Sequence, residues 1–358
     1  MFKNKKMKIA QIAPLWFPVP PKKYGGVERI VAQLCDGLVE KGHDVTLFAA
    51  PGSKTKAKLV SVFTKPLIEG GVSWSDPFWN LRNLAKAYEI ADKGGFDIIH
   101  SHLDVWALFF QNLIKAPTVH TMHNSLYRTG VEINKDFRLK LFNEERIKTN
   151  LVFLSKSAKN QSLINFKNSK VIYNGINLKH FKFNPIGGNH FVWVSRIDDY
   201  KGIENAIAAA EALNVKLLLA GRLDEAQKHY FNTRIKPHLS KNICYVGELT
   251  ESQLSDFYGC AKAFIYPIEW EEPFGLVVTE SMACGTPVIA YNRGSMSELI
   301  ENGKSGFVVK SNLKDLIEAM KNVGKINRYE VRKRVEKLFS KEIMVNNYER
   351  YYYKLFSK

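Results

Sequence analysis

The chain has 358 residues and is 45% hydrophobic, which is enough for two domains with separate cores. Its 52 lysines and arginines exceed its 35 acidic residues, and the formal net charge of +17 favours a polyanionic partner such as an anionic membrane face, nucleic acid or phosphorylated substrates. The basic residues are dispersed and form no RNA-binding signature, so nucleic acid is the weaker option, and a lysine-rich proteome would also explain the charge.

Membrane insertion and secretion find no support in the sequence. No apolar run approaches the ~18 residues of a membrane span. The basic and then apolar start of the chain ends in prolines, which favours a basic tail before a first strand over a signal peptide. The 4 cysteines are far apart and form no C-x-x-C pair, which is typical of a reduced, cytosolic protein.

Residues 7–50 predict a strand, a loop, a helix and a second strand. The loop at 16–24 is rich in proline and aromatic residues, and Gly25-Gly26 then begins a helix with a regular apolar stripe. A Gly-Gly turn at a strand-to-helix junction can admit a phosphate or a sugar against the backbone. Many α/β turns need glycine, however, and this one is not G-x-G-x-x-G, which argues against a standard dinucleotide site.

Residues 51–95 are less regular and include an aromatic loop at 73–79, for which packing on the core is favoured over an acceptor or membrane contact. Two strands follow, at 96–102 and 118–123, and both end in histidines. Side chains at strand carboxyl ends gather at one edge of a parallel sheet. Alternation should bury some of these histidines, and the absence of H-E-x-x-H argues against a metal site. The histidines concerned are His100, His102, His120 and His123.

The middle of the chain continues the α/β alternation. Its pattern predicts a basic helix at 136–148, a strand at 151–155, a helix at 155–167 and an interdomain linker at 177–190. The pattern restarts with a strand at 191–195. Arg196 and Lys201 flank the loop that follows and could bind a phosphate or be ordinary surface charge.

Residues 263–300 predict a strand, an acidic loop, a helix and a second strand. Gly275 precedes the helix, which contains Glu280 and ends at Gly285. The amides of residues 274–276 should lie unpaired at the helix start, where the helix dipole favours anions. With Glu272 and Glu280 nearby, this arrangement suits a ligand that has phosphate and hydroxyl groups, although the glutamates could also be solvated and Gly275 could serve only the turn.

The string E-P-F-G-L-V-V-T-E resembles the E-x7-E motif of the retaining glycosyltransferases of family GT4, which have the GT-B fold. The longer string W-E-E-P-F-G-L-V-V-T-E-S-M-A-C-G-T-P-V-I-A resembles the branch that contains glucosyltransferases of antibiotic biosynthesis. The match extends over most of the chain, and residues 171–176 resemble the last strand and turn of the family's first domain. It implies two Rossmann-like α/β domains with parallel sheets facing a cleft, at 1–182 and 189–338, and a last helix at 339–358 that crosses back to the first domain.

The resemblance also implies roles for individual residues. Glu280 would bind the ribose and Glu272 the sugar hydroxyls, and Arg196 and Lys201 match the R-x4-K-G diphosphate clamp. His123, with His120 as its rival, would contact the donor sugar near the reacting carbon. The remaining donor-binding positions are Gly25, Gly26, Phe274, Gly275 and Leu276. Glu271 stays an alternative to Glu272 as the first acid, although the eight-residue spacing to Glu280 favours Glu272.

The implied activity is transfer of a hexose from a nucleotide diphosphate sugar, best UDP-glucose or a related UDP-hexose, with retention of configuration. The acceptor would be a hydroxyl of a glycan, a lipid-linked sugar or a small molecule. The sequence contains no D-x-D, in keeping with a reaction that needs neither metal nor cofactor. A cytoplasmic protein with possible peripheral contact to the inner membrane face fits the charge. The alternatives are a nucleotide-sugar epimerase on the same fold and a non-catalytic polyanion-binding protein.

Overall fold

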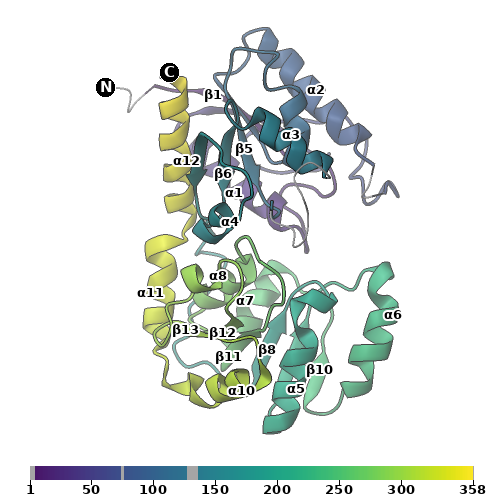
Figure 1. Cartoon of the computed structure of the whole chain (residues 1–358), viewed down its shortest axis with the longest axis vertical. Coiled ribbons are helices and arrows are strands. Elements are labelled where there is room, and N and C mark those ends of the chain that lie inside the picture. The colour runs from purple at the N-terminus through teal and green to yellow at the C-terminus, as the bar shows by residue number, and fades with distance from the viewer. Residues whose placement is uncertain (1–4, 74–75, 127–135, 358) are drawn as a thin grey trace. The chain divides into compact units, whose positions relative to one another are not determined.

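The computed structural model describes residues 5–73, 76–126 and 136–357. The chain folds into two compact units, one of Met1–Gly175 with Lys341–Lys358 and one of Ile176–Ser340 (Figure 1). The sequence placed these boundaries at 182, 189 and 338. Part of the aromatic loop at 73–79, Trp74 and Ser75, lies outside the described residues.

The described part of the first unit contains a seven-stranded parallel sheet in the order β3-β2-β1-β4-β5-β6-β7. Its strands are β1 Lys8–Ile12, β2 Asp44–Phe48, β3 Lys58–Val60, β4 Ile98–Ser101, β5 Thr118–Met122, β6 Asn150–Phe153 and β7 Asn168–Val171. β1 pairs with both β2 and β4, so the strand order reverses beside it. Open α/β sheets bind ligands at the carboxyl ends of strands beside such a reversal.

The helices of this unit are α1 Gly26–Glu40, α2 Phe78–Asp92, α3 Phe137–Glu145, α4 Lys156–Asn160 and α12 Lys341–Phe356. The three longest, α1, α2 and α12, each bury one side, as amphipathic helices do on a buried sheet. α12 comes from the far end of the chain and packs against α1. Its tyrosines Tyr348 and Tyr352 are completely buried, so this helix contributes to the core of the first unit.

The second unit has a six-stranded parallel sheet among its described residues, in the order β10-β9-β8-β11-β12-β13. Its strands are β8 Phe191–Val194, β9 Leu217–Ala220, β10 Ile243–Tyr245, β11 Ala263–Tyr266, β12 Val288–Tyr291 and β13 Gly306–Val309. Here the order reverses at β8, which pairs with β9 and β11. The helices are α5 Ile203–Leu213, α6 Lys228–Tyr230, α7 Glu251–Gly259, α8 Leu276–Ala283, α9 Met296–Leu299, α10 Leu313–Asn322 and α11 Arg328–Leu338. The predicted class, two Rossmann-like domains with parallel sheets, is confirmed.

Three local predictions were wrong. The helix expected at 155–167 ends at Asn160, because the asparagines and serines that follow are poor helix formers and make local side-chain bonds. The strand expected at 171–176 lies earlier, at Asn168–Val171. The irregular region at 51–95 contains α2, a helix of 15 residues.

Residues 177–190, expected to be a linker, are folded onto the second unit. The Arg328 side chain donates from Nε to the carbonyl of Asn184 at 2.7 Å, and the amide of Lys182 donates to Ser255 Oγ at 2.9 Å. The sequence showed no periodicity here because the segment is held by hydrogen bonds that involve side chains rather than by secondary structure. Among the described helices, none combines the length and the apolar character needed to cross a membrane.

Candidate active site

The loop after β8 is held close to the end of β11. Gly202 has φ 71°, and a Cβ at this position would lie 1.8 Å from the carbonyl oxygen of Pro267, so only glycine allows this approach. The indole Nε1 of Trp193 donates to the carbonyl of Lys201 at 3.2 Å and fixes the turn from inside. The R-x4-K-G spacing therefore places Lys201 beside the acidic loop that follows β11.

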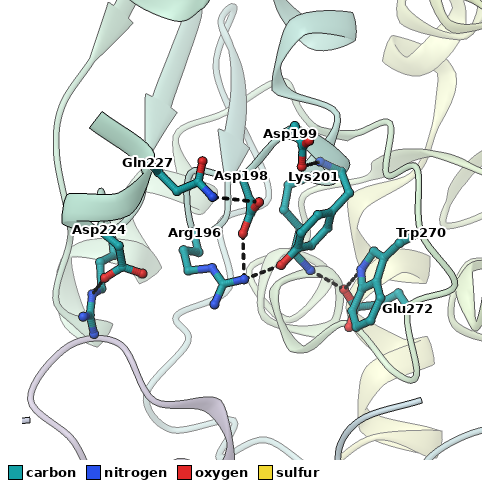
Figure 2. Close-up of polar contacts among 10 residues, drawn as sticks. Arg196, Asp198, Asp199, Lys201, Asp224, Gln227, Trp270 and Glu272 are labelled. Carbon is teal, nitrogen blue, oxygen red and sulfur yellow. Dashed lines mark hydrogen bonds and ion pairs between the residues drawn. The ribbon is translucent and has the colours of Figure 1, made fainter. Parts of the chain in front are cut away.

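Arg196 is the first basic residue of this loop, and Figure 2 shows its guanidinium among polar side chains. Its Nη2 donates to Asp198 Oδ2 at 2.7 Å and also to the hydroxyl of Tyr200. Asp198 is buried and accepts a second, longer bond from Gln227 Nε2 at 3.4 Å. Burial raises the pKa of Tyr200 to about 12, so its hydroxyl stays protonated beside the guanidinium. The guanidinium is thus oriented before any ligand binds.

Glu272 is the centre of a second polar cluster in Figure 2. Its Oε2 accepts from Lys201 Nζ at 2.9 Å, from Trp270 Nε1 at 3.0 Å and from the hydroxyl of Tyr266 at 3.0 Å. The side chains of Lys201 and Glu272 are only 12% and 14% exposed, so this is a largely buried ion pair. Burial, and then the charge of Glu272, raise the pKa of Tyr266 well above its usual range, which keeps this hydroxyl a donor.

Glu271, the alternative first acid, makes different contacts. Its Oε2 accepts from the amide of Gly294 at 2.7 Å, and Arg293 lies at 3.5 Å from its Oε1. It therefore ties the acidic loop to the turn after β12, whereas Glu272 joins the Lys201 cluster. Of the two glutamates, the geometry favours Glu272 as the one that shares a site with the basic residues.

The start of α8 lies just beyond this cluster. Gly275 has φ 91° and is the residue before the helix, and the amides of Gly275 and Leu276 donate to no described residue. Phe274 is buried, and its carbonyl accepts from the hydroxyl of Ser295. Glu280 lies one turn inside α8 and is 3% exposed. A helix start with available amides and a positive dipole is suited to an anion.

The Gly25-Gly26 turn begins α1 in the first unit. Gly25 has φ 141°, and a Cβ here would lie 2.7 Å from the Pro21 ring and 3.0 Å from Glu28 Oε2. Glu28, which the sequence did not single out, is buried, and its burial raises its pKa to about 7. The turn is therefore packed tightly between a proline and a carboxyl group, as well as lying at a strand-to-helix junction.

Three of the four histidines lie in one row, in which the ring centroids of His100 and His102 are 4.1 Å apart and those of His102 and His123 are 5.2 Å apart, whereas His120 has a different partner. His102 Nδ1 lies 2.9 Å from His123 Nε2, whereas His120 Nε2 lies 2.9 Å from Gln111 Oε1. Burial lowers the pKa of His123 to about 4 and that of His120 to about 3, so both rings are neutral at pH 7. His123 is the less buried of the two, which favours it over His120 for contact with a ligand. The described residues hold no group of three or more His, Cys, Asp or Glu placed to hold a metal.

Several contributors to these clusters were missed in the sequence. Tyr266 and Trp270 flank the acidic loop but have no spacing that would mark them as partners of Glu272. Arg222 follows β9 and pairs with Asp224 at 2.6 Å, at the same edge of the sheet as Arg196. Gln11, whose Oε1 lies 3.0 Å from His102 Nε2, offered one signal, because it is a buried polar residue between the apolar residues Ala10 and Ile12 of β1.

Two family models cover nearly the whole chain. The model for Glycosyltransferase Family 4 matches residues 24–180, and the model for Glycosyl transferases group 1 matches residues 177–338. An uncharacterized glycosyltransferase of Methanocaldococcus jannaschii is 31% identical over an alignment of 272 residues, which covers 72% of this chain and 74% of that protein.

Solved structures of related folds also match. The sucrose-phosphate synthase of Thermosynechococcus elongatus has a TM-score of 0.83 at 22% identity and covers 98% of this chain and 100% of its own. The Anabaena protein HepE, solved in complex with UDP-glucose, has a TM-score of 0.74 at 19% identity, with 96% and 99% of the two chains covered. At these identities the likeness concerns the fold.

Proposed function

Because the chain belongs to the GT4-type glycosyltransferases of the GT-B fold, we propose that it moves a hexose from a nucleotide diphosphate sugar to an acceptor hydroxyl with retention of anomeric configuration. The best candidate donor is UDP-glucose or a related UDP-hexose. The complex of the similar protein HepE with UDP-glucose supports this choice. The acceptor is a glycan, a lipid-linked sugar or a small molecule.

The observation that carries the proposal is the cluster at the carboxyl edge of the second sheet. Arg196 and Lys201 would bind the diphosphate, whose negative charge grows as the bond to the sugar breaks. The oriented guanidinium can donate two bonds to phosphate oxygens, and the Lys201 ammonium adds a compact charge. The amides of Gly275 and Leu276 and the dipole of α8 would add to the stabilisation. These groups supply positive charge without a metal or another cofactor.

Two carboxylates would recognise the rest of the donor. Glu272 Oε2 already accepts three hydrogen bonds. Its Oε1 accepts from no described residue, so that atom is available for sugar hydroxyls. Glu280, inside α8, would accept from the ribose hydroxyls. From the first unit, His123 and the Gly25-Gly26 turn would contact the sugar. The leaving phosphate oxygen would take the proton of the acceptor hydroxyl, so the proposal needs no carboxylate nucleophile.

A thermal-shift panel with UDP, GDP, ADP, TDP and CMP tests the donor site. A ligand that binds only the folded state raises the melting temperature by mass action. We expect UDP to stabilise the wild type and Glu280→Ala to respond less. The matched control is Glu318→Ala on α10, an exposed residue whose loss should leave the response to UDP unchanged.

Two outcomes would contradict the proposal. Turnover of UDP-glucose to another UDP-hexose without any acceptor would identify an epimerase. Stabilisation by heparin that falls steeply with salt, together with no response to any nucleotide, would identify a polyanion-binding protein.

The net charge of +17 also supports contact with an anionic membrane face, and flotation with anionic vesicles at low salt measures this separately.

A further inference from the structure

A chain of buried polar groups connects α12 with His123 inside the first unit. The hydroxyl of Tyr352 lies 2.6 Å from His100 Nδ1 and accepts from Gln11 Nε2 at 3.0 Å. Gln11 Oε1 lies 3.0 Å from His102 Nε2. His102 Nδ1 in turn lies 2.9 Å from His123 Nε2. Gln11, His100 and Tyr352 are fully buried and His102 is 4% exposed, so their polar groups must bond to one another.

The position of each proton follows from the orientation of the Gln11 amide, whose Nε2 faces the hydroxyl of Tyr352. A phenol has one proton, and because the Tyr352 oxygen accepts from Gln11, it can donate that proton to His100 Nδ1. His100 then carries its proton on Nε2 and donates it to Thr121 Oγ1, which lies 2.7 Å away. Burial raises the pKa of Tyr352 well above its usual range, so the phenol keeps its proton.

The same logic applies on the other side of Gln11. With its amide nitrogen toward Tyr352, Gln11 presents to His102 Nε2 an oxygen that can only accept, so this nitrogen must carry the proton. Burial lowers the pKa of His102 well below its usual range, so the ring is neutral and its Nδ1 is an acceptor. His123 must then donate from Nε2, which leaves its own Nδ1 without a proton.

We propose that Tyr352, acting through Gln11 and His102, fixes His123 in the Nε2–H tautomer, so that His123 Nδ1 accepts a hydrogen bond from a hydroxyl of the sugar substrate. Tyr352 is a positioning residue, because it orients another side chain and touches no substrate. No described residue bonds to His123 Nδ1, so this atom is left for a ligand. The inference rests on the proposed function only in giving His123 a sugar as its partner.

Nitrogen NMR of the protein with ¹⁵N-labelled histidine tests the tautomer directly. The signals of His123 are assigned by their loss in His123→Gln. In the wild type we expect a protonated Nε2 and an unprotonated Nδ1 on His123. A proton on Nδ1 would mean that the whole chain of bonds runs in the opposite direction, and would overturn the inference even if Tyr352→Phe does not fold.

Tyr352→Phe removes the hydroxyl that accepts from Gln11 Nε2 and so holds the Gln11 amide in one orientation. We expect Gln11 to lose its fixed orientation and the His102 and His123 signals to move to values averaged between the two tautomers. Tyr351→Phe is the matched control on the same helix, since the Tyr351 hydroxyl bonds only to the carbonyl of Asn168, at 3.4 Å, among the described residues. Unchanged tautomers in Tyr352→Phe would overturn the positioning role.

Transfer kinetics distinguish this inference from the proposed function. Loss of one oriented hydrogen bond to the substrate predicts that Tyr352→Phe lowers kcat about tenfold, with KM changed less than about twofold. Tyr351→Phe should retain the wild-type kcat. If no sugar transfer is found for the wild type, the proposed function fails, whereas the tautomer of His123 is still decided by NMR. If transfer is found and Tyr352→Phe retains the full kcat, the role of the fixed tautomer is wrong.

Discussion

The two units place their candidate residues in opposite kinds of environment. In the second unit Arg196, Lys201 and Glu272 are charged and lie on loops after strand ends. In the first unit the chain from Tyr352 to His123 is neutral, mostly buried and built on strands and a helix. The charged loops of the second unit are therefore suited to balancing a ligand's charge, whereas the neutral chain of the first unit is suited to fixing the direction of hydrogen bonds.

The largest effect is expected from removing a charge from the second unit. Lys201→Met should lower kcat/KM about 1000-fold, because in the proposed reaction the departing diphosphate would lose a neutralising group. It should also cost about 3–5 kcal/mol of unfolding free energy, because Glu272 is left largely buried without its partner. Transfer assays and urea denaturation measure the two effects.

Lys228→Met is the control for Lys201→Met. The pair of Lys228 with Glu225 has side chains that are 55% and 86% exposed, so its loss should change the unfolding free energy by less than about 1 kcal/mol. Equal losses of unfolding free energy in the two variants would mean that the buried Lys201–Glu272 pair contributes no more to stability than the exposed pair.

A second test compares the two neighbouring acids. Glu272→Gln keeps the shape but removes the charge that binds Lys201, so we expect kcat to fall about 100-fold, the value of a hydrogen bond to a charged group. Glu271→Gln should reduce kcat less than about tenfold, because Glu271 bonds to the turn at Gly294 instead. Steady-state kinetics with saturating donor measure both variants, and the opposite order would make Glu271 the first acid.

The neutral histidines of the first unit predict a pH dependence of stability. Their pKa values are lowered in the folded state, to about 3 for His120 and about 4 for His123, so below pH 6.5 the unfolded chain binds more protons. Their contribution is therefore complete above the unfolded pKa of ~6.5 and is lost as the pH falls from there toward 4. From pH 7 to pH 5 each should cost about 2 kcal/mol of unfolding free energy.

Urea denaturation at the two pH values measures this loss. His120→Gln should show a drop about 2 kcal/mol smaller than that of the wild type, because the variant has one fewer buried histidine to protonate on unfolding. His229→Gln, at an exposed position, should show the same drop as the wild type. A drop that His120→Gln leaves unchanged would mean that His120 is already protonated in the folded protein at pH 5.

Most of the fold could be predicted from the sequence because its signals are local. Apolar runs between turn residues located both sheets, and Gly26 and Gly285 marked the ends of helices. The predictions of a helix at 155–167 and of a linker at 177–190 were wrong for different reasons. The helix ends early because the serine and asparagine residues that follow it favour a helix poorly. The expected linker is held to the second unit by Arg328, which lies 144 positions from its partner Asn184.

The candidate site was only partly predictable, because local signals mark some of its residues but not the distant residues that they contact. Glu272, Glu280, Arg196 and Lys201 stand out because strand ends and helix starts place them. Their partners depend on how loops turn. Gln11 and His102 are 91 positions apart, and Tyr352 is 252 positions from His100, so no spacing in the sequence could connect them.

The return of α12 to the first unit has a consequence for the order in which the protein is made. The ribosome synthesises residues 176–340, which form a complete unit, before it adds Lys341–Phe356. Until then, Gln11 and His100 in the older part of the nascent chain have no Tyr352 to bond. The part of the chain that emerges first therefore cannot complete its core until the last helix has been made, and in the interval the face of α1 that α12 will cover stays exposed.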